Sequence, residues 1–270
     1  MKVLITHINP HLDDIFGIWL LKKYDPQYKD ASVEFISAAR DVAKNKENQD
    51  KVFVGTGGGQ FDEHKEGLKT CAGSLVYDFL KGGDLLPQDE LMVKALEEMT
   101  QWNKNIDMGL STISDLEEFS PQAFLRSKSI KKEDSTESVE LGIKILDRVL
   151  QVLKRKQQSL KDWEDRLEFE SRFGKTIAVK SEVIDRPFCK RKGGELFILY
   201  HPKYKGVQFF TPSQTLDLTP IYEKVKSLDP QASWFLHQSH HMVLCGSSSA
   251  PDAKPTKLSF EQLIELVKGL

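Results

Sequence analysis

Hydrophobic residues in the first hundred positions form short β-branched runs separated by longer stretches with helical spacing. The run Val3 to Ile5 predicts a buried strand, and Pro10 ends it before Asp13 and Asp14, which stand where a helix would begin. Residues 15–24 then place bulky apolar side chains at the intervals of a helix buried against a sheet. Further strands are predicted at 33–36 and 52–54, and helices at 68–80 and 89–103. The chain therefore opens as an α/β protein.

The second half of the chain has a different pattern. A polar stretch at 127–138 predicts an exposed loop, and residues from 137 to about 172 have the near-helical spacing of one long connecting helix. Beyond Gly174 short strands at 176–179, 195–200 and 207–210 indicate a smaller mixed α/β domain, and Ser259 with Gln262 predicts a capping box for a terminal helix. We therefore expect a first domain at 1–136, a connecting helix at 137–173 and a second domain at 174–270.

Composition and charge narrow the class of protein. The 270 residues are 39% hydrophobic and 29% charged with a net charge of -2, which is typical of a globular protein and not of one that grips long duplexes by overall charge. A short or single-stranded phosphodiester stays open as a substrate. The three cysteines have no paired spacing, and no export or organelle signal is visible, so we expect a cytoplasmic chain without a membrane segment. A homodimer is an open alternative.

The turn after the first strand carries the first candidate chemistry. His7, His11, Asp13 and Asp14 fall within eight positions, at the carboxyl end of a strand, where open α/β sheets place their ligand sites. Mixed nitrogen and oxygen donors suit a divalent ion such as Mn²⁺, Fe²⁺ or Zn²⁺ better than Ca²⁺ or Mg²⁺. The alternative is an ordinary proline turn with an aspartate at a helix N-cap. The density of donors favours the metal site.

A second polar cluster follows the third strand, in the segment G-T-G-G-G-Q-F-D-E-H-K. Gly57 to Gly59 can adopt positive φ and bring backbone amides close to an anion, while Asp62, Glu63 and His64 add further donors. A flexible hairpin turn would need the glycines but not the acids. This cluster is therefore the second candidate for the site.

The first motif resembles the opening H-x-N-P-D-x-D motif of the DHH phosphoesterase superfamily. His7, Asn9, Pro10, His11 and Asp13 match it position by position, with His11 in place of the first aspartate. The branch that resembles melanocyte proliferating gene proteins, which are three-prime exonucleases, also carries a histidine there. The resemblance implies a parallel-sheet metal domain, a connecting helix and a smaller mixed α/β domain.

The later motifs of the superfamily are matched with departures. Asp62, Glu63 and His64 stand at the place of the name-giving Asp-His-His, with Glu63 where the metal-binding histidine would be, and Asp107 matches the aspartate of an Asp-Asn-Gly sequence. Relatives carry a metal-bridging aspartate before the glycines, where this chain has Gly55. Either Asp14 or Asp41 supplies that carboxylate, or the site holds one ion, or the enzyme is degenerate.

The resemblance also assigns roles to residues. It implies metal ligands at His7, His11, Asp13, Glu63 and Asp107, and catalytic roles for Asp13 and His64. His64, His237, Gly246 and Ser247 would hold the substrate, whereas at least one of His240 and His241 is expected to be structural. The implied cofactor is Mn²⁺, with Mg²⁺ and Zn²⁺ as alternatives.

The expected function follows from these roles. The resemblance implies a metal-dependent phosphoesterase, an exonuclease acting on a short nucleic acid or nucleotide. The alternatives are a pyrophosphatase, a cyclic dinucleotide phosphodiesterase, and a catalytically degenerate protein that binds nucleotide or metal.

Overall fold

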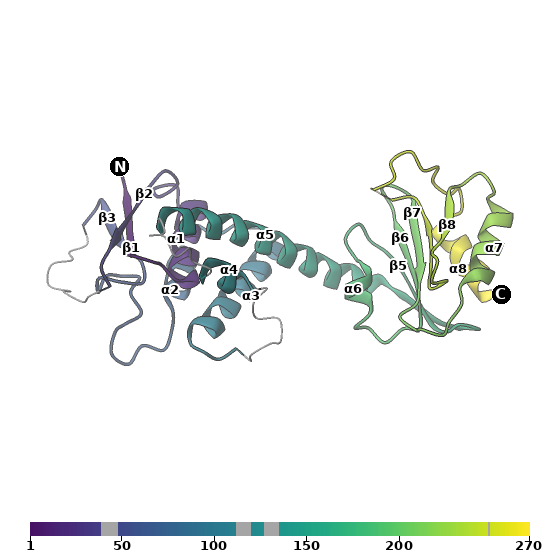
Figure 1. Cartoon of the computed structure of the whole chain (residues 1–270), viewed down its shortest axis with the longest axis horizontal. Helices are drawn as coiled ribbons and strands as arrows, with labels where there is room; N and C mark the ends of the chain where they lie inside the picture. The colour runs from purple at the N-terminus through teal and green to yellow at the C-terminus, as the bar shows by residue number, and fades with distance from the viewer. Residues whose placement is uncertain (39–47, 112–119, 127–134, 248) are drawn as a thin grey trace. The chain divides into compact units, whose positions relative to one another are not determined.

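The computed structural model describes residues 1–38, 48–111, 120–126, 135–247 and 249–270. The chain forms two compact units, Met1–Lys154 and Arg155–Leu270, and their boundary falls inside one helix (Figure 1). Asp41 and residues 127–134 of the predicted loop lie outside the described residues. In the part of the chain that the structure describes, no helix is long and apolar enough to span a membrane.

The first unit is built on a three-stranded parallel sheet, as expected from the family resemblance. Its strands are β1 (Val3–His7), β2 (Ser32–Ile36) and β3 (Lys51–Phe53), in the order β2-β1-β3. Leu4 is fully buried in the central strand and stands in register with Val33 and Val52. Because all three strands run the same way, the polar segments that follow β1 and β3 leave the sheet at one edge.

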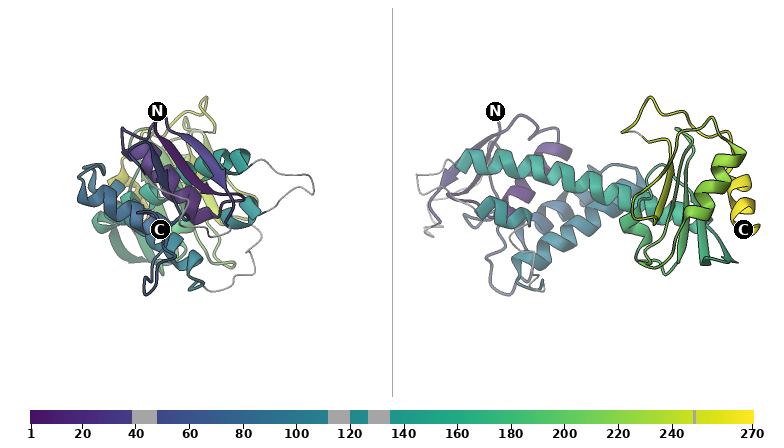
Figure 2. Two further views of the ribbon diagram at one scale, coloured as in Figure 1. Left: turned by 90° about the vertical axis from the view of Figure 1, so that its left-hand side faces the viewer. Right: turned by 45° about the vertical axis from the view of Figure 1, so that its right-hand side comes forward.

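Helices cover this sheet and supply most of the core. They are α1 (Leu12–Tyr24), α2 (Ala72–Gly82), α3 (Glu90–Asp107), α4 (Pro121–Arg126) and α5 (Ser135–Asp162). The left view of Figure 2 shows the strands in front of α1, whose residues from Leu12 to Leu21 are all buried. Gly73 lets α2 approach closely, since a Cβ there would overlap with Phe16 of α1.

Two predicted helices of this unit differ in their bounds. The helix expected at 68–80 begins at Ala72, and Leu68 lies in the preceding loop with 42% of its surface exposed. The helix expected at 89–103 continues to Asp107, and Asp89 is its N-cap, accepting hydrogen bonds from the amides of Leu91 and Met92. The extension carries Asp107 on the last turn of α3.

The second unit is a six-stranded mixed sheet with helices on both faces. Its strands are β4 (Leu167–Ser171), β5 (Gly174–Lys180), β6 (Leu196–His201), β7 (Gly206–Phe210), β8 (Trp234–Leu236) and β9 (Met242–Cys245). Their order is β4-β5-β6-β7-β9-β8, and the β5–β6 pair is parallel whereas the other pairs are antiparallel. The helices are α6 (Arg186–Cys189), α7 (Thr219–Leu228) and α8 (Phe260–Lys268).

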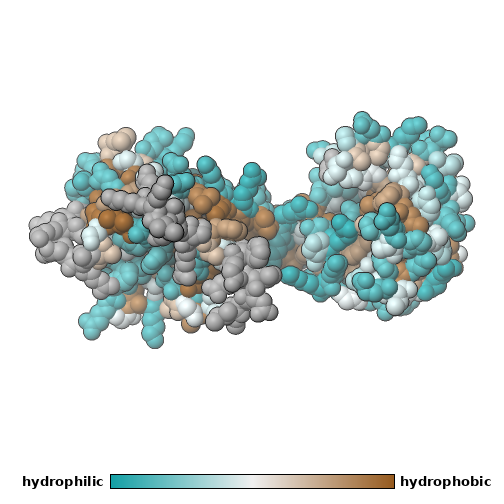
Figure 3. Space-filling view, in the orientation of Figure 1, coloured by the Kyte–Doolittle hydropathy of each residue, from teal (hydrophilic) through white to brown (hydrophobic). Residues whose placement is uncertain are grey.

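The capping box predicted for the terminal helix is confirmed. Ser259 Oγ accepts from the amide of Gln262, and Gln262 Oε1 accepts from the amide of Ser259. Figure 3 shows that hydrophilic residues, in teal, are interspersed with hydrophobic ones, in brown, on the visible face of each unit.

The connecting helix is shorter than predicted. Helix α5 ends at Asp162, a 3-10 turn follows at Trp163–Asp165, and Leu167–Ser171 is a strand that pairs antiparallel with β5. The prediction of a helix through 173 was therefore wrong. Trp163 is buried against the sheet and turns the chain, and the following L-E-F-E-S alternates apolar and acidic residues, which is the period of a strand.

Candidate metal centre

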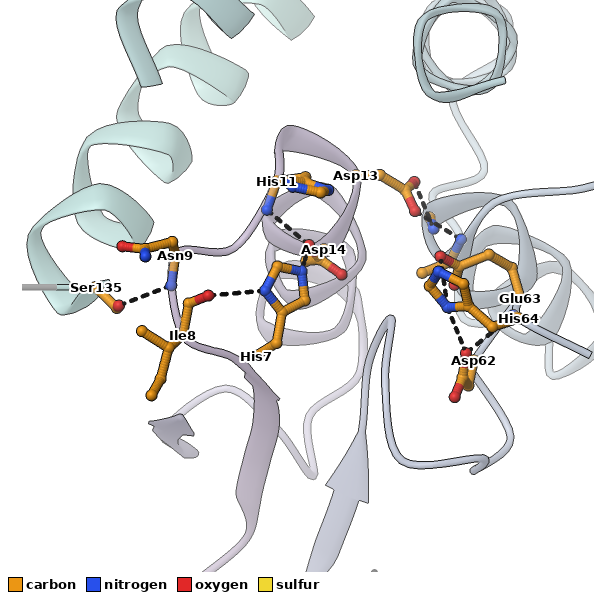
Figure 4. Close-up of polar contacts among 12 residues, drawn as sticks. His7, Ile8, Asn9, His11, Asp13, Asp14, Asp62, Glu63, His64 and Ser135 are labelled. Carbon is orange, nitrogen blue, oxygen red and sulfur yellow. Dashed lines mark hydrogen bonds and ion pairs between the residues drawn. The ribbon is translucent and has the colours of Figure 1, made fainter. Parts of the chain in front are cut away.

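The turn after β1 is held in a defined shape. Asn9 has φ 57°, in the left-handed region that asparagine tolerates, and its amide donates to Ser135 Oγ of α5 at 3.1 Å. Pro10 follows, His11 is the N-cap of α1, and the His11 amide donates to Asp14 Oδ2 at 2.7 Å. The local sequence thus places one histidine at the end of β1 and a second at the start of α1 (Figure 4).

The loop after β3 is organised by Asp62. Asp62 Oδ2 accepts from the amide of Gly58 at 2.6 Å, and Asp62 Oδ1 accepts from the amide of His64 at 3.0 Å. Burial opposes the charge of Asp62, but the amides of His64 and Gly58 hold the pKa of this carboxyl below its usual range. His64 Nδ1 lies 2.9 Å from the same Oδ1. In the neutral ring, a proton on Nδ1 that donates to Asp62 leaves Nε2 as a hydrogen-bond acceptor.

Three carboxylates from distant parts of the chain meet beside these turns. Asp13 of α1, Glu63 of the loop after β3 and Asp107 of α3 each offer an oxygen within 4.8 Å of the others. A second group, His7, His11 and Asp14, meets the same criterion. Both groups line one cavity of about 1060 Å³. The two polar turns predicted from the sequence therefore converge, as they must if they share an ion.

The carboxylates resist ionisation in the absence of a cation. Burial raises the pKa of Glu63 to about 7, and burial together with the charge of Asp13 raises the pKa of Asp107 to about 6. Burial and the charge of Asp14 raise the pKa of Asp13. Glu63 Oε2 is buried and has no hydrogen-bond partner among the described residues. A divalent cation would satisfy this oxygen and remove the repulsion, so the donor set fits a metal ion.

Asp13 has a structural role that the sequence did not reveal. Its Oδ2 accepts from the amide of Ala72 at 2.7 Å, and its Oδ1 accepts from the amide of Gly73 at 2.9 Å and from Asn103 Nδ2 at 2.5 Å. The first turn of α2 has no carboxylate of its own, so Asp13 caps this helix from α1. A carboxylate has about four lone-pair sites, which leaves room for an ion beside these donors.

Half-buried His7 and buried Asp14 form a pair at the start of α1. His7 Nε2 lies 2.9 Å from Asp14 Oδ2, and His7 Nδ1 lies 2.9 Å from the Ile8 carbonyl oxygen. The hydrogen bond to Asp14 raises the pKa of His7. Because each ring nitrogen of His7 faces an acceptor, these contacts favour the imidazolium form. Metal binding through Nε2 therefore requires His7 to lose the proton on Nε2, and Asp14 would then contact both His7 and the metal.

Gly55 explains how Asp14 reaches this place. Gly55 has φ 67°, and a Cβ added there would overlap with Asp14 Oδ1. The absence of a side chain at position 55 therefore gives the Asp14 carboxylate its room. Of the alternatives open from the sequence, this geometry favours Asp14 over a missing carboxylate.

The predicted substrate residues His237, Gly246 and Ser247 belong to the second unit. His237 Nδ1 lies 2.8 Å from Ser239 Oγ, and Gly246 has φ 72° where it passes Gly206. Their substrate role stays a prediction. His240 Nδ1 lies 2.9 Å from Thr219 Oγ1, and His241 Nδ1 lies 3.1 Å from the Leu216 carbonyl oxygen.

Comparison of the sequence with protein-family models and with curated proteins found no match. Among solved structures, one similar chain is described as a DHH-domain member of the s1p family of ribosomal proteins. It is 11% identical, with 98% of this chain and 85% of that chain covered and a TM-score of 0.33. Another is an exopolyphosphatase-related protein from Bacteroides fragilis, 10% identical, with 98% and 89% covered and a TM-score of 0.25. Similarity at this level does not define a shared activity.

Proposed function

We propose that this chain is a divalent-metal-dependent phosphoesterase of the DHH type that hydrolyses phosphodiester bonds at the end of short or single-stranded nucleic acid. The observation that carries the proposal is the meeting of Asp13, Glu63 and Asp107 in one cavity, with a buried Glu63 oxygen that lacks a partner among the described residues. The match of the first motif to the superfamily supports the same conclusion, and its histidine at His11 favours the exonuclease branch.

The residues present define which ion fits. Asp13, Glu63 and Asp107 would hold one ion through oxygen, and His7, His11 and Asp14 offer mixed nitrogen and oxygen donors beside it. This set suits Mn²⁺, with Mg²⁺ and Zn²⁺ as alternatives. When bound, such an ion lowers the pKa of a water molecule and neutralises charge on a phosphoryl group.

The chain's own residues would position the substrate. Asp62 orients the His64 ring through Nδ1, and the imidazolium form of His64 would donate from Nε2 to a phosphate oxygen. Gly57 lines the same cavity with φ 78°, a conformation that permits close approach of a phosphate to the backbone. Asp13 keeps α2 and Asn103 in place around the site.

The second candidate is a binder without turnover. The observation that favours it is the contact of Asp14 with His7, because Asp14 is the carboxylate that would replace the bridging aspartate missing at Gly55. In this case the cavity would bind metal or nucleotide but leave the phosphoester intact.

One experiment separates these functions. The full chain is stripped with EDTA and titrated calorimetrically with Mn²⁺, and its hydrolysis of short oligonucleotides, cyclic dinucleotides and pyrophosphate is then measured. The proposal expects Mn²⁺ binding that Glu63→Gln weakens, and Mn²⁺-dependent release of mononucleotides. Binding without any hydrolysis supports the second candidate. A chain that binds no divalent ion refutes both metal roles.

A further inference from the structure

The two faces of the six-stranded sheet in the second unit are covered by different elements. On one face Val207, Phe209 and Val243 belong to the core formed with α7 and α8. On the other face Phe197 and Phe210 pack with Trp163 and with Cys189 of α6. Figure 1 shows α6 on one side of the sheet and α7 and α8 on the other.

The α6 side of the sheet ends in an exposed aromatic residue. Phe235 of the edge strand β8 stands opposite Leu244 of β9. Because side chains alternate along a strand, Leu244 lies on the same face as Met242, which packs against the α6-side core. Phe235 is 53% exposed, and its ring meets the His237 ring edge to face at 6.4 Å between centroids. Two rings are thus presented at the edge of this face.

A basic segment lies on the same side. Residues 186–192, R-P-F-C-K-R-K, contain four cations and no carboxylate. None of these cations pairs with a carboxylate among the described residues. The Lys190 amide donates to the Arg186 carbonyl at 3.0 Å, which places these residues one helical turn apart, and Lys192 Nζ lies 4.7 Å from the Phe188 ring centre. The charge of this segment is therefore available to a ligand.

The basic segment and the aromatic edge are joined by direct contacts. Arg186 Nη1 lies 2.9 Å from Met242 Sδ, and the Met242 carbonyl accepts from the amide of His237 at 2.9 Å. They form a continuous surface, here called the β8–α6 surface, made of Arg186, Lys190, Arg191, Lys192, Phe235 and His237.

The second unit differs from the rest of the chain in net charge. Residues 155–270 contain 18 Lys and Arg against 14 Asp and Glu, a net charge of +4, although the whole chain carries -2. A cationic segment next to an exposed ring matches the two needs of an unpaired nucleotide chain, because phosphates seek cations and unstacked bases seek aromatic faces.

We propose that the β8–α6 surface binds single-stranded nucleic acid, with the cations on the phosphates and Phe235 stacked on a base. The inference rests on the proposed function and adds to it the surface that holds the single-stranded substrate. A duplex keeps its bases stacked on one another and offers no base face to Phe235, so the surface prefers unpaired strands.

Binding can be tested without the metal site. The full chain in EDTA is titrated against a fluorescently labelled 12-nucleotide single-stranded RNA, and anisotropy gives Kd at several salt concentrations. The variant Lys190→Gln/Arg191→Gln/Lys192→Gln is compared with Lys224→Gln/Lys226→Gln/Lys257→Gln, which removes the same charge around α7 and α8. We expect the first triple variant to bind at least about tenfold more weakly and with a shallower salt slope, and the control to change Kd less than about threefold.

A second pair of variants tests the ring. Phe235→Ala is compared with Leu228→Ala on α7, since both side chains are 53% exposed. Loss of stacking predicts that Phe235→Ala weakens binding about fivefold or more, whereas Leu228→Ala leaves Kd unchanged. Circular dichroism checks that each variant is folded.

Several results would overturn the proposal. They are equal losses in the two triple variants, no effect of Phe235→Ala, equal affinity for a 12-base-pair duplex, and no binding at all. Displacement of the RNA by inorganic polyphosphate at equal phosphate concentration, with Phe235→Ala unaffected, would make the surface a general polyanion site and would also refute it. Because the assay contains no metal, these results are independent of whether the first unit hydrolyses phosphoesters.

Discussion

The two units of this chain handle charge in opposite ways. Residues 1–154 contain 20 Lys and Arg against 26 Asp and Glu, a net charge of -6, whereas residues 155–270 carry +4. In the first unit carboxylates converge in a cavity, where burial raises the pKa of Glu63 to about 7. In the second, cations such as Lys190 and Arg191 are exposed. The two proposals accordingly assign cation binding to the first unit and binding of an anionic substrate to the second.

Sheet topology accounts for much of this difference. The parallel strands β1 and β3 deliver their following loops to one edge, so distant acids meet. The mainly antiparallel sheet of the second unit sends its loops to both ends. The first unit should therefore depend more than the second on the polar contacts of its loops for stability.

The largest expected effect tests that dependence directly. Asp13→Ala leaves the amides of Ala72 and Gly73 without their acceptor in a buried place, so we expect the free energy of unfolding to fall by about 3 to 5 kcal/mol. The matched change in the second unit, Asp185→Ala, removes an exposed cap of α6 and should cost about 1 kcal/mol. Urea unfolding measures both.

The contacts of Asp13 give it a second role beside the predicted metal-ligand role. A ligand role alone predicts that Asp13→Asn removes the metal and leaves the fold intact, but the cap on α2 predicts a loss of stability as well. Asp107→Asn, on the last turn of α3, should weaken metal binding with little change in stability. Equal stability of the two variants would argue against the capping role.

The next effect concerns the space at Gly55. Gly55→Ala strains a positive φ and displaces the Asp14 carboxylate, so we expect a loss of about 2 to 4 kcal/mol. Adding Asp14→Gly should recover part of the lost stability. The overlap between the new Cβ and the Asp14 carboxylate disappears, whereas the backbone strain of the positive φ at position 55 stays. Thermal unfolding of the two single variants and the double variant measures the coupling. Strict additivity would show that Asp14 does not occupy this place.

Metal binding gives a third test of the comparison. Glu63→Gln should weaken Mn²⁺ binding by about a hundredfold or more, since it removes a charged ligand from the group. Glu66→Gln, an exposed change nearby, should not. Calorimetry measures affinity, and hydrogen exchange should show Mn²⁺ protecting the first unit more than the second. Equal protection of both units by Mn²⁺ would contradict the expected difference between them.

The smallest expected effect is on pH dependence. The pKa of Glu63 rises from 4.5 to about 7 in the folded chain, so the folded state binds the proton more tightly than the unfolded state does. Stability of the metal-free chain should therefore fall as pH rises from about 5 to 7, by on the order of 2 kcal/mol. Glu63→Gln should flatten this slope. A slope that the variant leaves unchanged would assign the titration to other groups.

The sequence by itself determined what depends on neighbouring residues. The periodic spacing of apolar residues predicted the strand at Val3 and the buried helix after Asp14. The spacing of Ser259 and Gln262 alone predicted their capping box. These features rest on contacts within about four positions, so a local pattern carries them. The helix predicted through 173 failed because the burial of Trp163, a tertiary contact, ends it early.

Only the tertiary structure decided how the site is assembled. Asp13 reaches Gly73 across 60 positions and Asn103 across 90, and Asp14 takes the room that Gly55 leaves. Contacts over such separations depend on how α1 packs between the sheet and α2, and no periodicity in the chain records them. The sequence thus supplied the donors and their order, and packing decided which of them became ligand, cap or partner.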